Sequence, residues 1–162
     1  MKTHILGIGD FTTISVPGEA IKTFSLGSCV AVIICDPKTG CVAMDHIALP
    51  DSSINMKISQ QKPGYFADTG IPAMIESMKK SGSNGNYRGF IVKLAGGANV
   101  LDTSNTFNIG KRNILAIKKI LWRYGMGALS EDIGGNISRT VEVNVNTKMV
   151  TITSPGKQSW QL

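Results

Sequence analysis

The sequence predicts an α+β fold in which mixed β-sheets form a sandwich-like core and two main helices pack on the outside. Three observations lead to this prediction. Short β-branched or alternating segments fill the first third and the last quarter of the chain. Two other segments carry apolar residues at the period of an amphipathic helix. The helices do not alternate regularly with the strands, which argues against a doubly wound parallel sheet.

Size and composition narrow the class of protein. The chain has 162 residues, which suits a single domain over residues 1–162. Hydrophobic residues make up 42% and charged residues 17% of it, a globular balance. The net charge is +6, but the basic residues are dispersed and aromatic residues are only 6%, so we expect no nucleic-acid ligand. No apolar run reaches the roughly 18 residues of a membrane span, so we expect no membrane insertion.

The N-terminal third reads as strands and one hairpin. The strands are expected at His4–Gly9, Ile21–Leu26, Val30–Cys35 and Cys41–Leu49. The run Val30–Cys35 is β-branched and continuously apolar, as in a strand buried on both faces. Asp36–Gly40 contains Pro and Gly at turn positions. Val30–Leu49 is therefore predicted to be a β-hairpin.

The rest of the chain alternates between helix and strand signals. The polar segment Asp51–Lys62 has no period and is expected to be an exposed loop. A first helix is expected to start with Asp68 or Thr69 as its cap and to end at Gly82, and a second to span Ile109–Tyr124. Their core stripes are Ile71, Met74, Ile75 and Met78 in the first, and Ile114, Ile117, Leu121 and Tyr124 in the second. Further strands are expected at Gly89–Ala95, Met126–Ile133, Thr140–Val145 and Lys148–Thr153.

The hairpin brings a cysteine and a histidine together. Cys29 directly precedes its first strand and His46 lies on its second. A turn centred near Lys38 would set them almost opposite each other, with Cβ atoms about 5 Å apart. A thiol beside an imidazole can form a thiolate at neutral pH and act as a nucleophile. The alternative interpretation is a small buried cysteine and a core histidine with satisfied hydrogen bonds.

Residues around this pair add to the catalytic interpretation. Gly27 allows the backbone a sharp approach, and N–H groups near Ser28 could stabilise an oxyanion. The other histidine, His4, is expected to be a partly buried or edge residue of the first strand. The three cysteines are spaced C-x5-C-x5-C, which matches neither a structural zinc motif nor a closed disulfide framework. We therefore expect no metal, no organic cofactor and a reducing, cytoplasmic environment.

Two segments resemble the signature of the CheD family, the chemoreceptor glutamine deamidases of chemotaxis. They are T-F-S-L-G-S-C-V-A-V at residues 23–32 and H-I-A-L-P at residues 46–50. As in the family pattern, Thr23 lies six residues before Cys29, and His46 lies seventeen residues after it. The resemblance continues over most of the chain, at Ile8–Asp10, Tyr65–Asp68, Ala95–Ala98, Asn108–Asn113, Glu131–Gly135 and Arg139. Cys41, Asp45 and Ala48 depart from residues that are common in relatives. Strand alternation predicts that Asp45 points away from the face of His46.

The resemblance implies an activity and a set of residue roles. Cys29 would be the nucleophile, His46 the general base and acid, and Thr23 the residue that orients the imidazole. Gly27 and Ser28 would shape the oxyanion site. The implied substrates are glutamines of methyl-accepting chemotaxis receptors, which would be converted to glutamate through a thioester. The same thiol could also hydrolyse receptor glutamate methyl esters.

The resemblance and the residues leave alternatives open. The family also implies a CheC-type phosphatase as a partner, so the chain could act mainly as a regulatory binding module. The order of cysteine before histidine would also suit an unrelated cysteine peptidase, which the full-length resemblance disfavours. The second helix carries several cations that could steer an acidic receptor helix or could simply form a solvated face. These cations are Lys111, Arg112, Lys118, Lys119 and Arg123.

Overall fold

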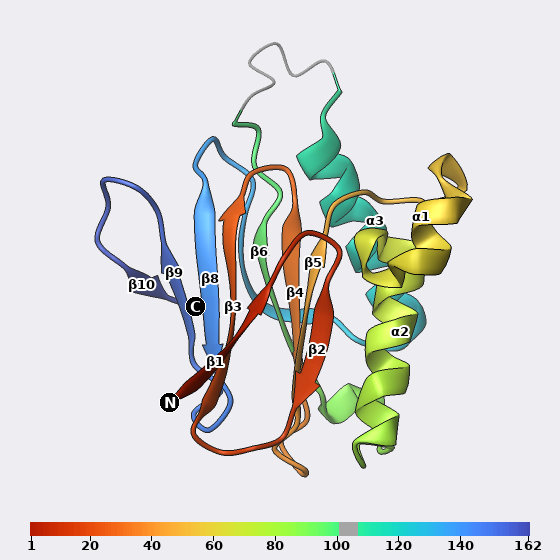
Figure 1. Cartoon of the computed structure of the whole chain (residues 1–162), viewed down its shortest axis with the longest axis vertical. Helices are drawn as coiled ribbons and strands as arrows, with labels where there is room; N and C mark the ends of the chain where they lie inside the picture. Colours follow the sequence, from red (N-terminus) through yellow and green to blue (C-terminus); the bar gives the residue numbers. More distant parts are fainter. Residues whose placement is uncertain (101–106) are drawn as a thin grey trace.

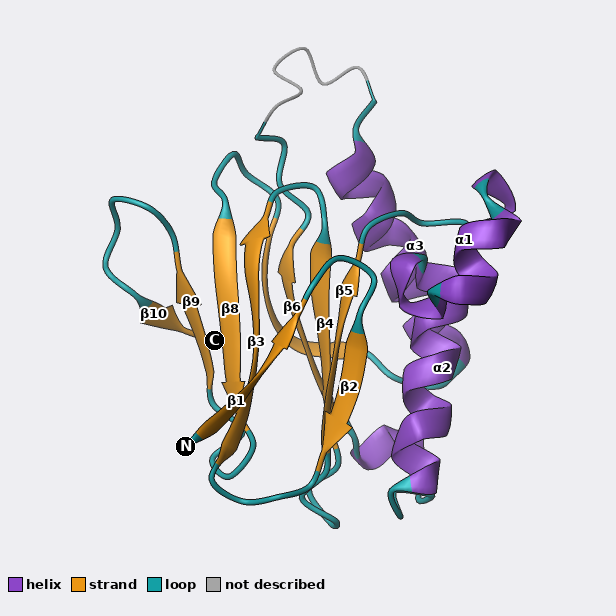
Figure 2. Ribbon diagram, in the orientation of Figure 1, coloured by secondary structure: helices purple, strands orange, loops and turns teal. Residues whose placement is uncertain are grey.

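The chain folds into two five-stranded sheets that pack face to face, with helices covering the outer face of one sheet (Figures 1 and 2). The computed structural model describes residues 1–100 and 107–162. The first sheet has the order β1-β3-β8-β9-β10, with strands Lys2–Leu6, Glu19–Leu26, Arg139–Asn144, Val150–Thr153 and Trp160–Gln161. The second has the order β2-β5-β4-β6-β7, with strands Phe11–Ile14, Val42–Ile47, Val30–Cys35, Ile91–Gly96 and Ala128–Ile133. Both sheets are mixed, because β1–β3 and β6–β7 pair in parallel. The predicted α+β sandwich is confirmed.

The helices lie on one side of the sandwich. Figure 2 shows α2 (Ala67–Lys80) and α3 (Ile109–Arg123) next to the second sheet, and the short helix α1 (Met56–Gln61) at one end of this layer. Single 3₁₀ turns at Ser52–Ile54, Pro63–Tyr65 and Tyr87–Gly89 complete the helical segments. The predicted stripes of both helices are buried except for Tyr124, which is partly buried against the same core.

Strand β4 lies at the centre of the fold and is buried on both faces, as predicted. Val30, Val32 and Ile34 belong to the core beneath the helices. The alternate residues Ala31, Ile33 and Cys35 belong to the core between the two sheets. Each of the six residues is 1% exposed or less. Because side chains alternate across a strand, a continuous apolar run is what a strand between two cores requires.

Several expected elements differ in the structure. Most of Asp51–Lys62 forms a 3₁₀ turn and α1, where a loop was expected; Asn55 caps α1 by accepting a hydrogen bond from the Ile58 N–H at 3.1 Å. Six residues are too few to display a helical period. The strands β2 and β10 were not predicted, because four and two residues are likewise too few to display the alternation of a strand. The cap expected for α2 was also wrong: Phe66 is the N-cap residue, and Asp68 accepts hydrogen bonds from Ser52 instead.

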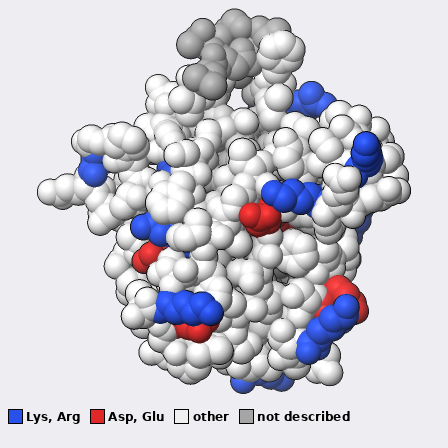
Figure 3. Space-filling model, in the orientation of Figure 1, with Lys and Arg blue, Asp and Glu red and all other residues white. Residues whose placement is uncertain are grey.

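Two surface and length features of the structure bear on charge and on apolar segments. On the face seen in Figure 3, basic and acidic side chains are scattered, several of them side by side, and form no continuous basic patch. Within residues 1–100 and 107–162, no helix is long and apolar enough to cross a membrane.

Candidate active site

The register of the β4–β5 hairpin decides how the cysteine and the histidine meet. Ala31 pairs with His46 and Val30 with Ile47. Extended by one residue, this register would set Cys29 opposite Ala48, two residues beyond His46. Cys29 and His46 therefore lie on neighbouring strands, as predicted, but are not directly opposite each other. The shift by two residues nevertheless keeps both side chains on the face of the hairpin that looks toward the first sheet. Cys29 directly precedes the paired part of β4 and would be a diagonal neighbour of His46 if the register continued by one residue.

The offset comes from the turn. The Asp36 N–H donates to the Cys41 carbonyl and the Gly40 N–H to the Asp36 carbonyl, each at 2.9 Å. Four residues therefore lie between Asp36 and Cys41, and the turn is centred between Lys38 and Thr39. This centre lies half a residue beyond Lys38, so every cross-strand partner moves by one residue relative to a turn centred on Lys38. Cys41, which follows the turn, is fully buried in the core beneath the helices.

His46 is held from the opposite sheet by Thr23 on β3. Thr23 Oγ1 lies 2.6 Å from His46 Nδ1 and 2.9 Å from the Leu6 carbonyl oxygen, to which it donates. A hydroxyl has one hydrogen, and a carbonyl can only accept. The Thr23 hydroxyl must therefore accept from Nδ1–H. This arrangement assigns the tautomer of His46 and leaves its Nε2 with a lone pair. Nε2 is buried and has no hydrogen-bond partner among the described residues.

Burial keeps both groups of the pair neutral. It raises the pKa of the Cys29 thiol to about 11. It also lowers the pKa of His46 to about 4; the positive charge of Lys62 adds to this effect and the negative charge of Asp10 opposes it. In the structure described, Cys29 Sγ makes no hydrogen bond to His46. The resting pair is thus a thiol and a neutral imidazole, which differs from the thiolate that the sequence suggested.

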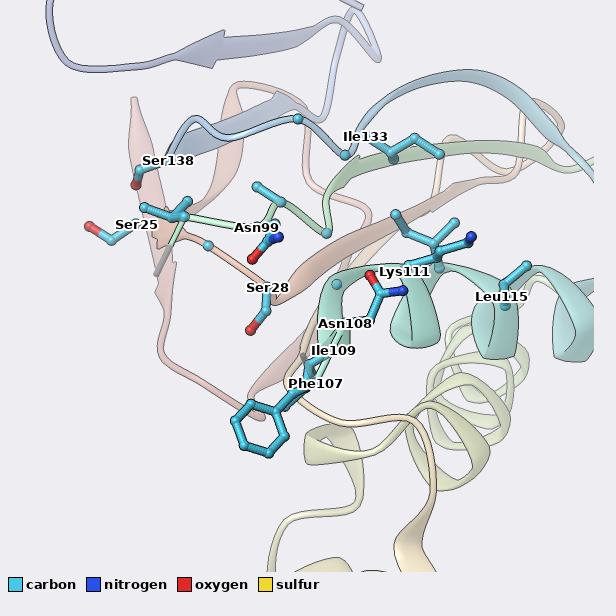
Figure 4. Close-up of a pocket in the computed structure, with 18 residues that line it drawn as sticks. Ser25, Ser28, Asn99, Phe107, Asn108, Ile109, Lys111, Leu115, Ile133 and Ser138 are labelled. Carbon is cyan, nitrogen blue, oxygen red and sulfur yellow. The ribbon is translucent and has the colours of Figure 1, made fainter. Parts of the chain in front are cut away.

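The segment before Cys29 borders a mostly apolar pocket of about 820 Å³. Gly27 and Ser28 form part of its wall, and the first turns of α3 form another part (Figure 4). Cys29 itself does not line it. In the described part of the chain, the N–H groups of Ser28 and Cys29 have no hydrogen-bond acceptor.

Gly96 and Gly97 pack on the segment that carries Cys29. The Gly97 N–H donates to the Cys29 carbonyl at 2.8 Å. Gly96 has φ +116°, and a Cβ there would overlap the same carbonyl oxygen. Arg139, 4% exposed, donates to the Gly134 carbonyl and pairs with Asp132 at 2.9 Å, which braces this end of the second sheet. The sequence indicated these residues only as segments of the family resemblance.

Asp45 lies on the opposite face of β5 from His46, as strand alternation predicted. It is fully buried, its two carboxyl oxygens have no partner within the described residues, and burial raises its pKa well above the usual range. Gly64 and Gly70 make room for it, since a Cβ on either would press on a carboxyl oxygen. Asp45, one of the residues that differ from the family pattern, therefore packs against α2 and not toward His46. The other histidine, His4, lies on the edge strand β1 and pairs with Glu19 at 2.6 Å.

Comparison with known proteins identifies the family. The family model described as CheD chemotactic sensory transduction matches residues 48–154. A Syntrophotalea carbinolica protein named probable chemoreceptor glutamine deamidase CheD is 48% identical over 162 residues, which span 100% of this chain and 100% of that protein. A Thermotoga maritima protein named chemoreceptor glutamine deamidase CheD is 40% identical over 152 residues, which span 94% of this chain and 92% of that protein.

Among solved structures, a Neisseria meningitidis protein of family DUF152 aligns with a TM-score of 0.43 and 12% identity, over 78% of this chain and 53% of its own. The family assignment rests on the sequence relatives, because they are 40–48% identical to this chain over nearly the full length of both proteins. The chain belongs to the CheD family.

Proposed function

We propose that this protein hydrolyses the side-chain amide of glutamines in methyl-accepting chemotaxis receptors, producing glutamate and ammonia. The names of the relatives support the substrate class. The observation that carries the chemistry is the buried chain from the Leu6 carbonyl through Thr23 to His46. It presents an unprotonated, unpartnered Nε2 on the same face as a partly buried cysteine.

In the first half of the reaction, Cys29 Sγ attacks the carboxamide carbon while its proton passes to His46 Nε2. The N–H groups of Ser28 and Cys29 donate to the oxygen on which negative charge develops. The imidazolium then gives its proton to the departing nitrogen, so ammonia leaves and a thioester remains. Thr23 keeps Nδ1 protonated throughout, so that the exchanged proton stays on Nε2.

In the second half, water attacks the thioester and gives a proton to Nε2. The C–S bond breaks, the thiol is restored and glutamate is released. The overall change is one amide and one water converted to one carboxylic acid and one ammonia. No cofactor is required. The three free cysteines support a reducing, cytoplasmic setting for the reaction.

Because Cys29 and His46 are both neutral at rest, the Cys29 thiolate has to form during the reaction. Burial raises the pKa of the Cys29 thiol to about 11 and lowers the pKa of His46 to about 4. Both shifts disfavour transfer of the thiol proton to the imidazole in the resting site. We therefore propose that the thiol loses its proton as it attacks the substrate, without a stable thiolate forming beforehand.

The basic residues of α3 are candidates for steering the receptor, although not all are free. Lys118 pairs with Glu131 at 2.9 Å, so it contributes less than the sequence suggested. Arg112, Lys119 and Arg123 line a shallow hollow beside Pro50. Charge reversal at the last three should slow association with a receptor fragment and flatten its salt dependence. Binding of a CheC-type phosphatase stays a prediction that a pull-down tests.

The deciding experiment incubates the protein with a cytoplasmic receptor fragment and follows glutamine-to-glutamate conversion by peptide mass spectrometry, together with ammonia release. Cys29→Ala should abolish turnover while the melting temperature stays near that of the wild type. Turnover within tenfold of wild type in Cys29→Ala would exclude the proposed nucleophile. A variant at Cys41, a cysteine remote from the site, serves as the control.

A further inference from the structure

The two strands that carry the catalytic pair separate just before they reach Cys29. The paired register of β4 and β5 ends at Val30 and Ile47. The Ala48 N–H then bonds to the Tyr65 carbonyl at 3.0 Å, away from β4. The Cys29 carbonyl is taken by Gly97. Beyond the last pair, the strand ladder therefore no longer sets the distance between the cysteine and histidine strands.

A single side chain of α3 spans the opening. Asn113 Nδ2 donates to the Ser28 carbonyl at 2.9 Å and to the Ala48 carbonyl at 3.0 Å. These carbonyls belong to the residue next to Cys29 and to the residue two places after His46. Both hydrogens of the amide are thus used, one on each strand. The amide group takes the place of the ladder hydrogen bonds that would otherwise join the strands here.

The environment of Asn113 fixes this orientation. The residue is fully buried, and its Oδ1 has no partner within the described part of the chain. Turning the amide over would set Oδ1 against two carbonyl oxygens, so the observed orientation is the favourable one. A buried acceptor without a partner is unfavourable for stability and is rare in folded proteins. Here it accompanies the contact that ties the two strands together.

The start of α3 is built to bring Asn113 within reach. Gly110, one turn earlier, packs its backbone on the carbonyls of Gly97 and Ala98, and a Cβ there would overlap both oxygens. Gly97 in turn leaves space for Ile114. Helix and sheet therefore approach more closely than side chains would allow, and an amide as short as that of asparagine can reach between the strands.

We propose that Asn113 is a positioning residue that sets the separation of Cys29 and His46 by clamping the Ser28 and Ala48 carbonyls. This inference rests on the proposed function. Asn113 is buried and cannot touch the receptor, so it acts on kcat and not on substrate affinity. A displacement of about 1 Å in reacting groups can reduce a rate by about 100-fold.

The test compares three variants in the receptor deamidation assay, with rates expressed per folded molecule. Asn113→Leu keeps the volume and removes both donors. Asn113→Asp also lacks them when ionised, but its protonated form regains one O–H donor. Ile117→Ala, one turn along α3, removes buried contacts of the same helix without touching either carbonyl and is the matched control for lost stability.

We expect Asn113→Leu to lose at least 30-fold in kcat with KM within twofold, and Ile117→Ala to stay within threefold. Asn113→Asp should gain activity from pH 8 to pH 6, because protonation restores a donor. A kcat for folded Asn113→Leu within threefold of wild type would overturn the proposal, as would an equal loss in Ile117→Ala. If Asn113→Leu does not fold, the pH profile of Asn113→Asp decides, and a profile parallel to the wild type counts against the clamp. An active Cys29→Ala would instead refute the proposed function.

Discussion

Replacing Thr23 by valine tests the central hydrogen bond of the site. Valine has nearly the shape of threonine but removes the acceptor for His46 Nδ1–H and the donor to the Leu6 carbonyl. Without the acceptor, the imidazole gains no advantage from carrying its proton on Nδ1. A part of the population then holds the proton on Nε2 and cannot act as a base, and the ring loses its fixed orientation.

The size of the effect follows from the structure. General-base catalysis typically contributes 10²–10⁴-fold. A neutral hydroxyl orients an imidazole less strongly than a carboxylate, so we expect kcat to fall by about 100-fold, or about 2.7 kcal/mol in the barrier. Thr23 is fully buried, so the groups left unpaired should lower the stability by about 2 kcal/mol in total. For a chain of this length, that corresponds to a melting temperature about 4–8 °C lower.

The assay is glutamine conversion in the receptor fragment, measured at a temperature where all variants are folded. Thr23→Ser is the matched control, since it keeps the hydroxyl and loses only a methyl group; it should retain activity within about fivefold. Nitrogen NMR of His46 reports the tautomer directly. The reasoning is refuted if Thr23→Val stays within threefold of wild type, or if Thr23→Ser is as impaired as Thr23→Val.

Three further predictions concern protonation and backbone packing. Because burial raises the pKa of Cys29 to about 11, its alkylation by iodoacetamide should accelerate about tenfold per pH unit from pH 7 to 10; a rate already at its plateau at pH 7 contradicts a neutral resting thiol. His46 has a pKa of about 4 when folded and 6.5 when unfolded. Its contribution is therefore present above pH 6.5, and up to about 3 kcal/mol of stability is lost between pH 6.5 and 4. Denaturant titrations at several pH values should find this loss in wild type and not in His46→Asn. An equal change in the free energy of unfolding with pH in both proteins would disprove it. Gly96→Ala should lower both activity and melting temperature, since it strains φ and presses on Cys29, whereas Gly127→Ala meets open space and should change neither.

Local sequence patterns determined much of the fold. The β-branched run of β4 required two apolar neighbouring layers, and it has them. The apolar stripe of α3 placed that helix within one residue of its observed ends. The hairpin from Val30 to Ile47 also followed from local signals, because its turn residues lie between its own strands. Its exact register did not, since a shift of half a residue in the turn centre changes every partner by one, and turn composition does not set that position.

Packing between distant segments decided the details of the site. Thr23 and His46 lie in different sheets, and nothing within either strand indicates that they touch; only the family resemblance joined them. Asn113 reads as an ordinary polar residue of a helix until the sandwich places it between two strand ends. Burial also raises the pKa of Cys29 and lowers that of His46, which favours a neutral pair where the sequence suggested a thiolate. Desolvation depends on the atoms that surround a group in three dimensions, and the sequence neighbours of Cys29 and His46 do not supply them.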